Sequence, residues 1–114
     1  MLVDGERIVD VGSFSVPDGA RVIDLGDVTL LPGLMDMEVN LLLGGPDHGG
    51  ALNAVQDDAA LRTLRAVANA RRTLRAGFTT VRNLGLFVKT GGLLLDVALM
   101  KAIDFGWFEG PRVV

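Results

Sequence analysis

Short alternating runs of polar and apolar residues open the chain. An Asp4-Gly5 turn dipeptide lies within residues 2–11, which predicts a β-hairpin. Residues 21–25 and 28–31 alternate again around a Gly26-Asp27 turn, which predicts two further strands. This first part therefore reads as a small β-sheet, too small to bury a core by itself.

The next stretch is apolar and contains a Pro32-Gly33 turn. It predicts a central strand within residues 30–40. Side chains two residues apart on a strand share a face, so we expect Glu38 and Asn40 to point the same way. Polar groups at the end of an apolar run are costly unless they are paired, solvated or bound to a ligand. This pair is therefore the main candidate for chemistry.

Helical and strand patterns alternate after the central strand. We expect helices over residues 57–76 and 94–105, a strand over 78–82 and the start of another at 112–114. Asp57 or Asp58 can cap the first helix, and Gly77 ends it. A β-α-β-α-β order at this spacing predicts parallel strands joined by crossover helices, hence an α/β fold.

The helical periodicity also predicts which residues face inward. In the first helix these are Leu64, Val67 and Leu74, with the arginines of residues 62–75 on a solvated face. In the second they are Leu95, Leu99, Met100 and Ile103. Trp107 and Phe108, after the second helix, are expected to pack under the following loop.

Composition narrows the class of protein. The chain has 114 residues, 11 basic and 14 acidic, for a net charge of −3. That balance argues against nucleic acid or an anionic membrane as a partner. There are no cysteines, which excludes disulfides and thiolate ligands and fits a cytoplasmic protein. No signal peptide or membrane-spanning stretch is expected.

Several motifs in order resemble one family. They include Val22-Ile23-Asp24-Leu25-Gly26, residues 29–37 (Thr-Leu-Leu-Pro-Gly-Leu-Met-Asp-Met), residues 69–74 (Asn-Ala-Arg-Arg-Thr-Leu), residues 76–85 (Ala-Gly-Phe-Thr-Thr-Val-Arg-Asn-Leu-Gly) and the run from Asp96 to Val113. Together they resemble the N-terminal portion of the amidohydrolase superfamily, most closely its imidazolonepropionase-like and prolidase-like members.

The resemblance implies a metal-dependent hydrolase on a (β/α)8 TIM barrel, with a small composite β-sandwich built from both chain ends. Residues 1–31 would be a partial β-sandwich subdomain and residues 32–114 the first βαβαβ segment of the barrel. A complete barrel needs about 250 residues, so the barrel would be incomplete. Family members use a divalent metal, zinc in general, to activate water.

In the family the first barrel strand ends in His-x-His, and Glu38 and Asn40 stand at those positions. The further ligands, a lysine and two histidines, and a catalytic aspartate come from later strands, so we expect no catalytic residue here. Glu38 and Asn40 could hold an oxygen-preferring ion such as Mg²⁺ or Mn²⁺. The alternative is that both are solvated and that the metal is absent or weakly bound.

Other polar residues have simpler explanations. His48, the single histidine, lies in a glycine-rich loop and is expected to be a loop residue rather than a base or ligand. Asp36 is expected to hydrogen-bond the neighbouring turn, and Arg82 and Asn83 end the strand of residues 78–82. Asn83 could line a pocket or simply form an Asn-Leu-Gly turn.

The sequence thus predicts part of an amidohydrolase acting on amide or peptide-like C–N bonds, such as an Xaa-Pro dipeptide or a cyclic amide. This chain alone is expected to be inactive. Alternatives are a non-catalytic remnant that serves as a structural or interaction module, and an oxygen-ligated metal-binding module. Because an open parallel sheet leaves strand edges unpaired, further copies of the chain or a separate chain supplying the missing barrel are the expected partners.

Overall fold

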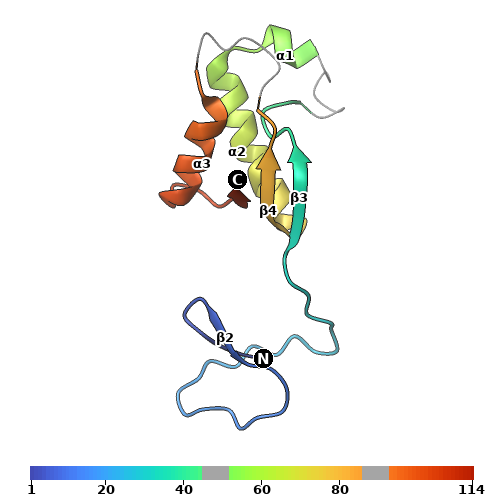
Figure 1. Ribbon diagram of the computed structural model, residues 1–114, viewed down its shortest axis with the longest axis vertical. Helices are drawn as coiled ribbons and strands as arrows, with labels where there is room; N and C mark the ends of the chain where they lie inside the picture. The colour runs from blue at the N-terminus through green and yellow to red at the C-terminus, as the bar shows by residue number, and fades with distance from the viewer. Residues whose placement is uncertain (45–51, 86–92) are drawn as a thin grey trace. The chain divides into compact units, whose positions relative to one another are not determined.

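The computed structural model describes residues 1–44, 52–85 and 93–114 (Figure 1). The chain divides into two compact units, Met1–Leu30 and Leu31–Val114. No helix in the described parts of the chain is both long and apolar enough to cross a membrane. Each unit is described by itself below.

The first unit contains the hairpin that the Asp-Gly dipeptide predicted. Strands β1 (Leu2–Asp4) and β2 (Arg7–Asp10) pair antiparallel. Gly5 between them has φ of 56°, a left-handed conformation that glycine adopts without steric penalty. The hairpin is therefore confirmed.

The two further strands expected in this unit, at residues 21–25 and 28–31, are wrong. Residues 11–33 contain no helix or strand. The turn between the expected strands does form, because the Asp24 carboxylate accepts a hydrogen bond from the Gly26 N–H at 2.8 Å. Val22 and Ile23 are 68% and 64% exposed. An alternating segment becomes a strand only where a neighbouring strand pairs with it, and none does so in this unit.

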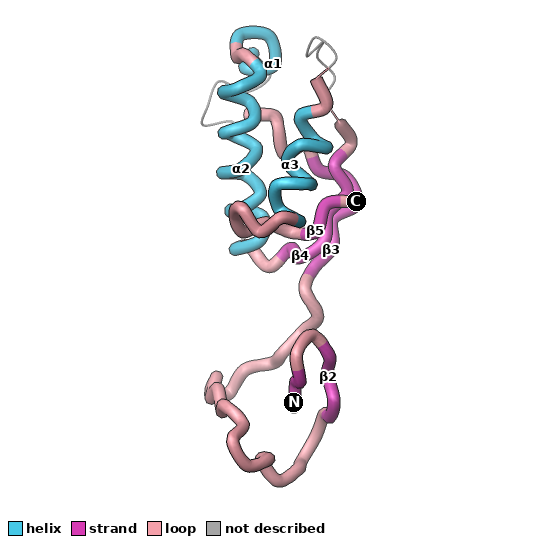
Figure 2. The backbone as a smooth tube through the Cα atoms, turned by 90° about the vertical axis from the view of Figure 1, so that its left-hand side faces the viewer, coloured by secondary structure: helices cyan, strands magenta, loops and turns pink. Residues whose placement is uncertain are grey.

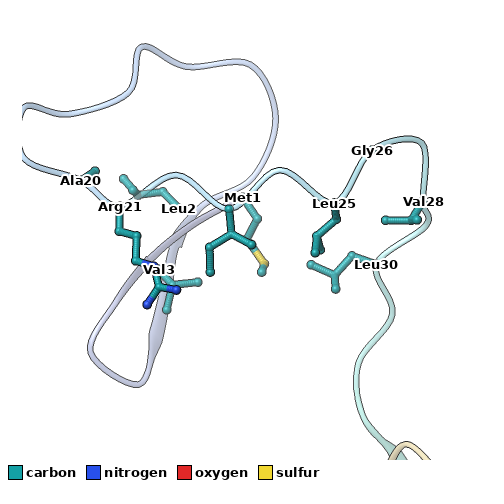
Figure 3. Close-up of a pocket in the computed structure, with 10 residues that line it drawn as sticks. Met1, Leu2, Val3, Ala20, Arg21, Leu25, Gly26, Val28 and Leu30 are labelled. Carbon is teal, nitrogen blue, oxygen red and sulfur yellow. The ribbon is translucent and has the colours of Figure 1, made fainter.

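A hollow of about 590 Å³ lies between the hairpin and the extended segment of the first unit. Figure 3 shows the side chains of Leu25, Val28 and Leu30 pointing into the same space. The lining also includes Met1 and Leu2 from the hairpin end, so the hollow is mainly apolar.

The second unit is built on a three-stranded parallel sheet. Its strands β3 (Leu34–Val39), β4 (Phe78–Asn83) and β5 (Arg112–Val113) lie in the order β3-β4-β5. Both pairs of neighbours are parallel, as the alternating pattern predicted. The central strand was expected within residues 30–40, and it runs from Leu34 to Val39. Asn40 therefore follows the strand instead of ending it.

Two crossover helices join these strands, α2 (Ala59–Arg75) and α3 (Leu95–Asp104), and a single helical turn, α1 (Asn53–Gln56), precedes them. Figure 2 shows α2 and α3 on the same side of the sheet. The predicted helices are confirmed to within two residues at each end. α2 begins where the Asp58 carboxylate accepts a hydrogen bond from the Leu61 N–H, and it ends before Gly77, whose φ is 96°.

The core of this unit lies between the helices and the sheet. Its buried members come from α2, β4, α3 and the loop that follows β3: Leu41, Leu42, Ala66, Ala70, Val81 and Leu99. Leu95 and Ile103 of α3 and Val67 of α2 pack against it, as the periodicity predicted. The small side chains of Ala66 and Ala70 let the α2 backbone lie close to its neighbours, and Gly110 extends this close packing next to Ile103.

The sequence predicted the wrong exposure for three residues, Leu64, Arg62 and Trp107. Leu64 is 68% exposed, whereas Arg62 is only 6% exposed. The buried stripe of α2 runs through Arg62, Ala66 and Ala70 at intervals of four residues, which turns Leu64 to the opposite face. Trp107 is 76% exposed and lies at an angle to the Phe105 ring, whereas Phe108 is partly buried and packs against the core.

Candidate functional site at the carboxyl ends of β3 and β4

Polar side chains gather where β3 and β4 end. Glu38 lies near the end of β3, Asn40 follows it, and Asn83 is the last residue of β4. Ligands of parallel α/β sheets generally bind outside the carboxyl ends of the strands. This edge of the sheet is therefore where a site would be expected.

A β-bulge interrupts β3 just before this edge. Asp36 pairs with Val81 and Val39 pairs with Asn83, so Met37 and Glu38 together lie opposite the single residue Arg82. The Asp36 carboxylate accepts a hydrogen bond from the Glu38 N–H at 2.9 Å. The Arg82 Nε donates to the Met37 carbonyl at 2.8 Å. Side chains of neighbouring residues thus satisfy backbone groups around the bulge.

The bulge changes the surroundings of the two candidate ligands. Strict alternation predicted a shared face for Glu38 and Asn40, but alternation does not hold across a bulge. The Glu38 side chain is exposed. The Asn40 Oδ1 is buried and has no hydrogen-bond partner among the residues that the structure describes. Asp36, which the sequence placed at a turn, instead bonds within its own strand.

Two asparagines hold the loop that follows β3. The Asn83 Oδ1 accepts a hydrogen bond from the Leu41 N–H at 3.0 Å. From α2, the Asn69 Nδ2 donates to the carbonyls of Leu41 and Leu43 at 2.8 and 3.0 Å. The same loop places Leu41 and Leu42 in the core. Asn83 therefore positions the backbone of this loop, and it also lines a hollow of about 230 Å³ with Val97 and Met100, which agrees with the expectation that it lines a pocket.

Sequence reasoning missed the role of Asn69. A signal was present, because asparagine is unfavourable within a helix and α2 is otherwise rich in alanine, leucine and arginine. An asparagine inside a helix therefore suggests that its side chain makes a specific hydrogen bond. Asn69 also lines a hollow of about 400 Å³ beside β3, together with Asn40 and Arg72.

Comparison with solved structures gives clear matches. An amidohydrolase shares 34% identity with a TM-score of 0.64, over 85% of this chain and 21% of that one. A Xaa-Pro dipeptidase with methionine bound in its active site shares 30% identity with a TM-score of 0.55, over 72% of this chain and 18% of that one. A prolidase complexed with N-methylphosphonate-L-proline shares 29% identity with a TM-score of 0.53, over 82% of this chain and 22% of that one.

These matches support the amidohydrolase superfamily, to whose structures this chain is similar over part of their length. The chain spans about a fifth of the length of the superfamily members that it matches. A scan of protein-family models found no match, and neither did a search of curated proteins.

The superfamily generally depends on a metal, so the fit of these residues to a metal can be tested. A catalytic zinc takes three protein ligands, commonly histidines with a carboxylate. Among the residues that the structure describes, no group of three histidine, cysteine, aspartate or glutamate side chains could hold an ion. Glu38 offers one exposed carboxylate and Asn40 a buried amide oxygen. These two residues do not fit a catalytic zinc by themselves.

An oxygen-ligated ion at Glu38 and Asn40 therefore stays a prediction. His48 lies outside the described residues. Arg82 and Asn83, the other polar residues at this edge, are engaged with the backbone of β3 and of the loop after it. The arrangement shows how the carboxyl edge of the sheet is built.

Proposed function

We propose that this chain forms part of a metal-dependent amidohydrolase that cleaves amide or peptide-like C–N bonds. In this proposal β3, β4 and β5 are the first three strands of a (β/α)8 barrel. The first unit contributes to a composite β-sandwich. The observation that carries the proposal is the sequence-matched likeness to an Xaa-Pro dipeptidase and an amidohydrolase over most of this chain.

The arrangement of the second unit supports the barrel. A barrel of this kind is a parallel sheet with every helix on its outer side. Here the strands are parallel and in sequential order, and α2 and α3 cover one side only (Figure 2). No described helix covers the other side, and Met35 and Met37 of β3 are 68% and 44% exposed. In the proposal this side faces the barrel interior.

The proposed substrate is an Xaa-Pro dipeptide or a cyclic amide, by analogy with the solved relatives. We further propose that the chain is inactive alone and acts in the cytoplasm. Glu38 and Asn40 replace the expected histidine pair, and three strands cannot surround a metal with the ligands that catalysis needs. What this chain supplies is the rigid start of the barrel, held by Asn69 and Asn83.

A chimera tests the proposal. The matching fifth of the solved prolidase is replaced by this chain, either unchanged or as the double variant E38H/N40H. We expect both chimeras to fold. We expect the double variant to bind zinc stoichiometrically by metal analysis and to hydrolyse Xaa-Pro dipeptides, because it restores two nitrogen ligands. The unchanged chimera should do neither.

The single variants E38H and N40H are the matched controls and should bind less zinc than the double variant. Failure of both chimeras to fold would contradict the barrel assignment. Hydrolysis by the unchanged chimera at the rate of the parent enzyme would contradict the proposed inactivity.

An interaction module is the second candidate function. The observation that favours it is the pair Glu38 and Asn40, which lacks the nitrogen ligands of an active member. A module of this kind would bind partner proteins while the unchanged chimera stays inactive. The third alternative, an oxygen-ligated metal module, predicts Mn²⁺ binding to the chain that E38A abolishes in a calorimetric titration.

A further inference from the structure

Two Asp-Gly dipeptides occur in the sequence, and both lie at turns of the first unit. Asp4-Gly5 lies where the hairpin turns, and Asp18-Gly19 lies in the turn that follows Pro17. In an Asp-Gly pair the glycine nitrogen can attack the neighbouring side-chain carboxyl group with little hindrance, because glycine has no side chain. The two sites therefore share one chemistry and differ in how the fold holds them.

The turn around Asp18 leaves the reacting groups free to move. The Ala20 N–H donates to the Pro17 carbonyl at 3.1 Å, and Gly19 has φ of 80°, as the third residue of a type II turn requires. The central peptide of this turn joins Asp18 to Gly19, and no described residue forms a backbone hydrogen bond with it. The Asp18 carboxylate likewise accepts no hydrogen bond from the described part of the chain. Rotation of this peptide therefore breaks no other contact.

The hairpin holds Asp4 more firmly. Asp4 pairs with Arg7 across the turn, and this pairing fixes the orientation of the peptide that follows Asp4. Before the Gly5 nitrogen can reach the Asp4 carboxyl group, this peptide has to rotate, which breaks the pair at the hairpin end. Reaction at Asp4 therefore requires local opening of the hairpin.

Ring closure at Asp18 needs no reagent other than water. The Gly19 nitrogen attacks Cγ of the protonated Asp18 carboxyl group, a C–N bond forms, and the carboxyl hydroxyl leaves as water with the amide proton. Water then opens the cyclic imide. Cleavage of the new N–Cγ bond restores aspartate, whereas cleavage of the original peptide C–N bond leaves isoaspartate, in which the main chain runs through Cβ. One water is lost and one is gained, so the mass and the net charge of the chain stay unchanged.

We propose that Asp18 is a site of spontaneous isoaspartate formation and that the hairpin protects Asp4 from the same reaction. The consequence falls on the hollow of the first unit, because Ala20, directly after the turn, lines it together with Met1 (Figure 3). Isoaspartate adds one carbon to the main chain just before Ala20 and so lengthens the connection between the two walls of the hollow. This proposal is independent of the proposed enzymatic function.

Peptide mapping tests the proposal, because trypsin places the two sites in different peptides, residues 1–7 and 8–21. The full 114-residue chain is incubated at neutral pH in heavy-oxygen water, folded or unfolded in urea, and then digested. Each passage through the imide incorporates one heavy oxygen, and liquid chromatography separates isoaspartate peptides from aspartate peptides of equal mass. We expect similar rates at both sites in urea. In the folded chain peptide 8–21 should react close to its unfolded rate. Peptide 1–7 should react about two- to fivefold more slowly, since a two-stranded hairpin is only marginally stable.

Two variants identify the reacting residue in peptide 8–21. D18E keeps the charge, but the longer side chain forms an imide much less readily, so isoaspartate should disappear from this peptide and peptide 1–7 should be unaffected. D10E is the matched control. The Asp10 carboxylate accepts a hydrogen bond from the Val11 N–H at 2.7 Å, but the branched Val11 side chain hinders attack, so D10E should change nothing.

Three results would overturn the proposal. The first is an equal rate at Asp4 and Asp18 in the folded chain, and the second is the absence of isoaspartate from peptide 8–21. The third is isoaspartate that persists in D18E and disappears in D10E, which would assign the reaction to Asp10. Circular dichroism of both variants confirms that they keep the fold of the unchanged chain.

Discussion

The Asn69 side chain connects α2 to the loop after β3 through two hydrogen bonds. Its Nδ2 donates to the carbonyls of Leu41 and Leu43, and Asn83 holds the Leu41 N–H from the other side. The backbone of Leu41 is therefore satisfied by two side chains that are far from it in sequence. Because Leu41 and Leu42 are core residues, these bonds couple the carboxyl edge of the sheet to the core.

Substitution of Asn69 should destabilise the second unit. In N69A two carbonyls of a part-buried loop lose their donor, which costs about 1–3 kcal/mol. Alanine is a better helix former than asparagine by about 0.6 kcal/mol, which offsets part of the loss. We expect the free energy of unfolding, measured by urea denaturation, to fall by about 1–2 kcal/mol.

The matched control for N69A is R71A. Arg71 is exposed two residues further along the same helix, and its substitution should change the free energy of unfolding by less than about 0.5 kcal/mol. Equal effects of the two substitutions would show that the Asn69 hydrogen bonds contribute nothing to stability.

The helix α2 is the longest element, and its start depends on one side chain. The Asp58 carboxylate accepts a hydrogen bond from the Leu61 N–H at 2.8 Å, while Asp57 forms an ion pair with Arg65. The sequence left open which of the two aspartates caps the helix. The structure assigns the cap to Asp58, because Asp57 lies one residue too early and reaches Arg65 instead.

Removal of the cap should weaken α2. In D58A the first turn loses its side-chain acceptor, which typically costs about 1 kcal/mol. Urea denaturation should show this decrease in the free energy of unfolding. D58N keeps a hydrogen-bond acceptor at the cap and should be nearly as stable as the unchanged chain. A D58N variant as unstable as D58A would indicate that charge, rather than the hydrogen bond, stabilises the helix start.

Elements with strong local signals could be predicted from the sequence, and elements that depend on distant neighbours could not. The hairpin, both long helices and the parallel strands follow from turn residues, caps and periodicity. The strands expected at residues 21–25 and 28–31 had the right alternation but no pairing strand. The bulge in β3 could not be predicted from the sequence either, because it is defined by the register of β3 against β4.

The candidate site was only partly predictable for the same reason. The sequence placed Glu38, Asn40 and Asn83 near one edge, and the structure brings Asn83 and Asn69 together around Leu41. Those bonds join residues 28 and 42 positions apart, so no local pattern could reveal them. The close approach of Gly33 to Thr79 is likewise a tertiary feature.

At the level of the complete chain, most of the first unit lacks regular secondary structure, unlike the second unit. Residues 11–33 contain no helix or strand, and nearly all of their side chains are exposed. Arg21 lies within this segment, whereas the arginines of α2 lie in a capped helix. Backbone without secondary structure is the preferred target of proteases.

Limited digestion should therefore begin within residues 11–33. We expect trypsin to cleave after Arg21 before it cleaves within α2, because cleavage of a helix requires local unfolding. Mass spectrometry of early time points identifies the products, and circular dichroism of the larger fragment should keep the helical signal. R21Q removes the site and should delay the first cut. Early cleavage inside α2 would contradict the stability assigned to the second unit.

The turn at Pro17–Ala20 has a practical consequence for work with this protein. The Ala20 N–H donates to the Pro17 carbonyl at 3.1 Å, and Gly19 projects from an exposed tip with open space around it. Such a tip accepts foreign sequence with little disturbance of the flanking backbone. A fluorescent tag or a purification epitope inserted there would report on the intact polypeptide while both of its ends stay unmodified.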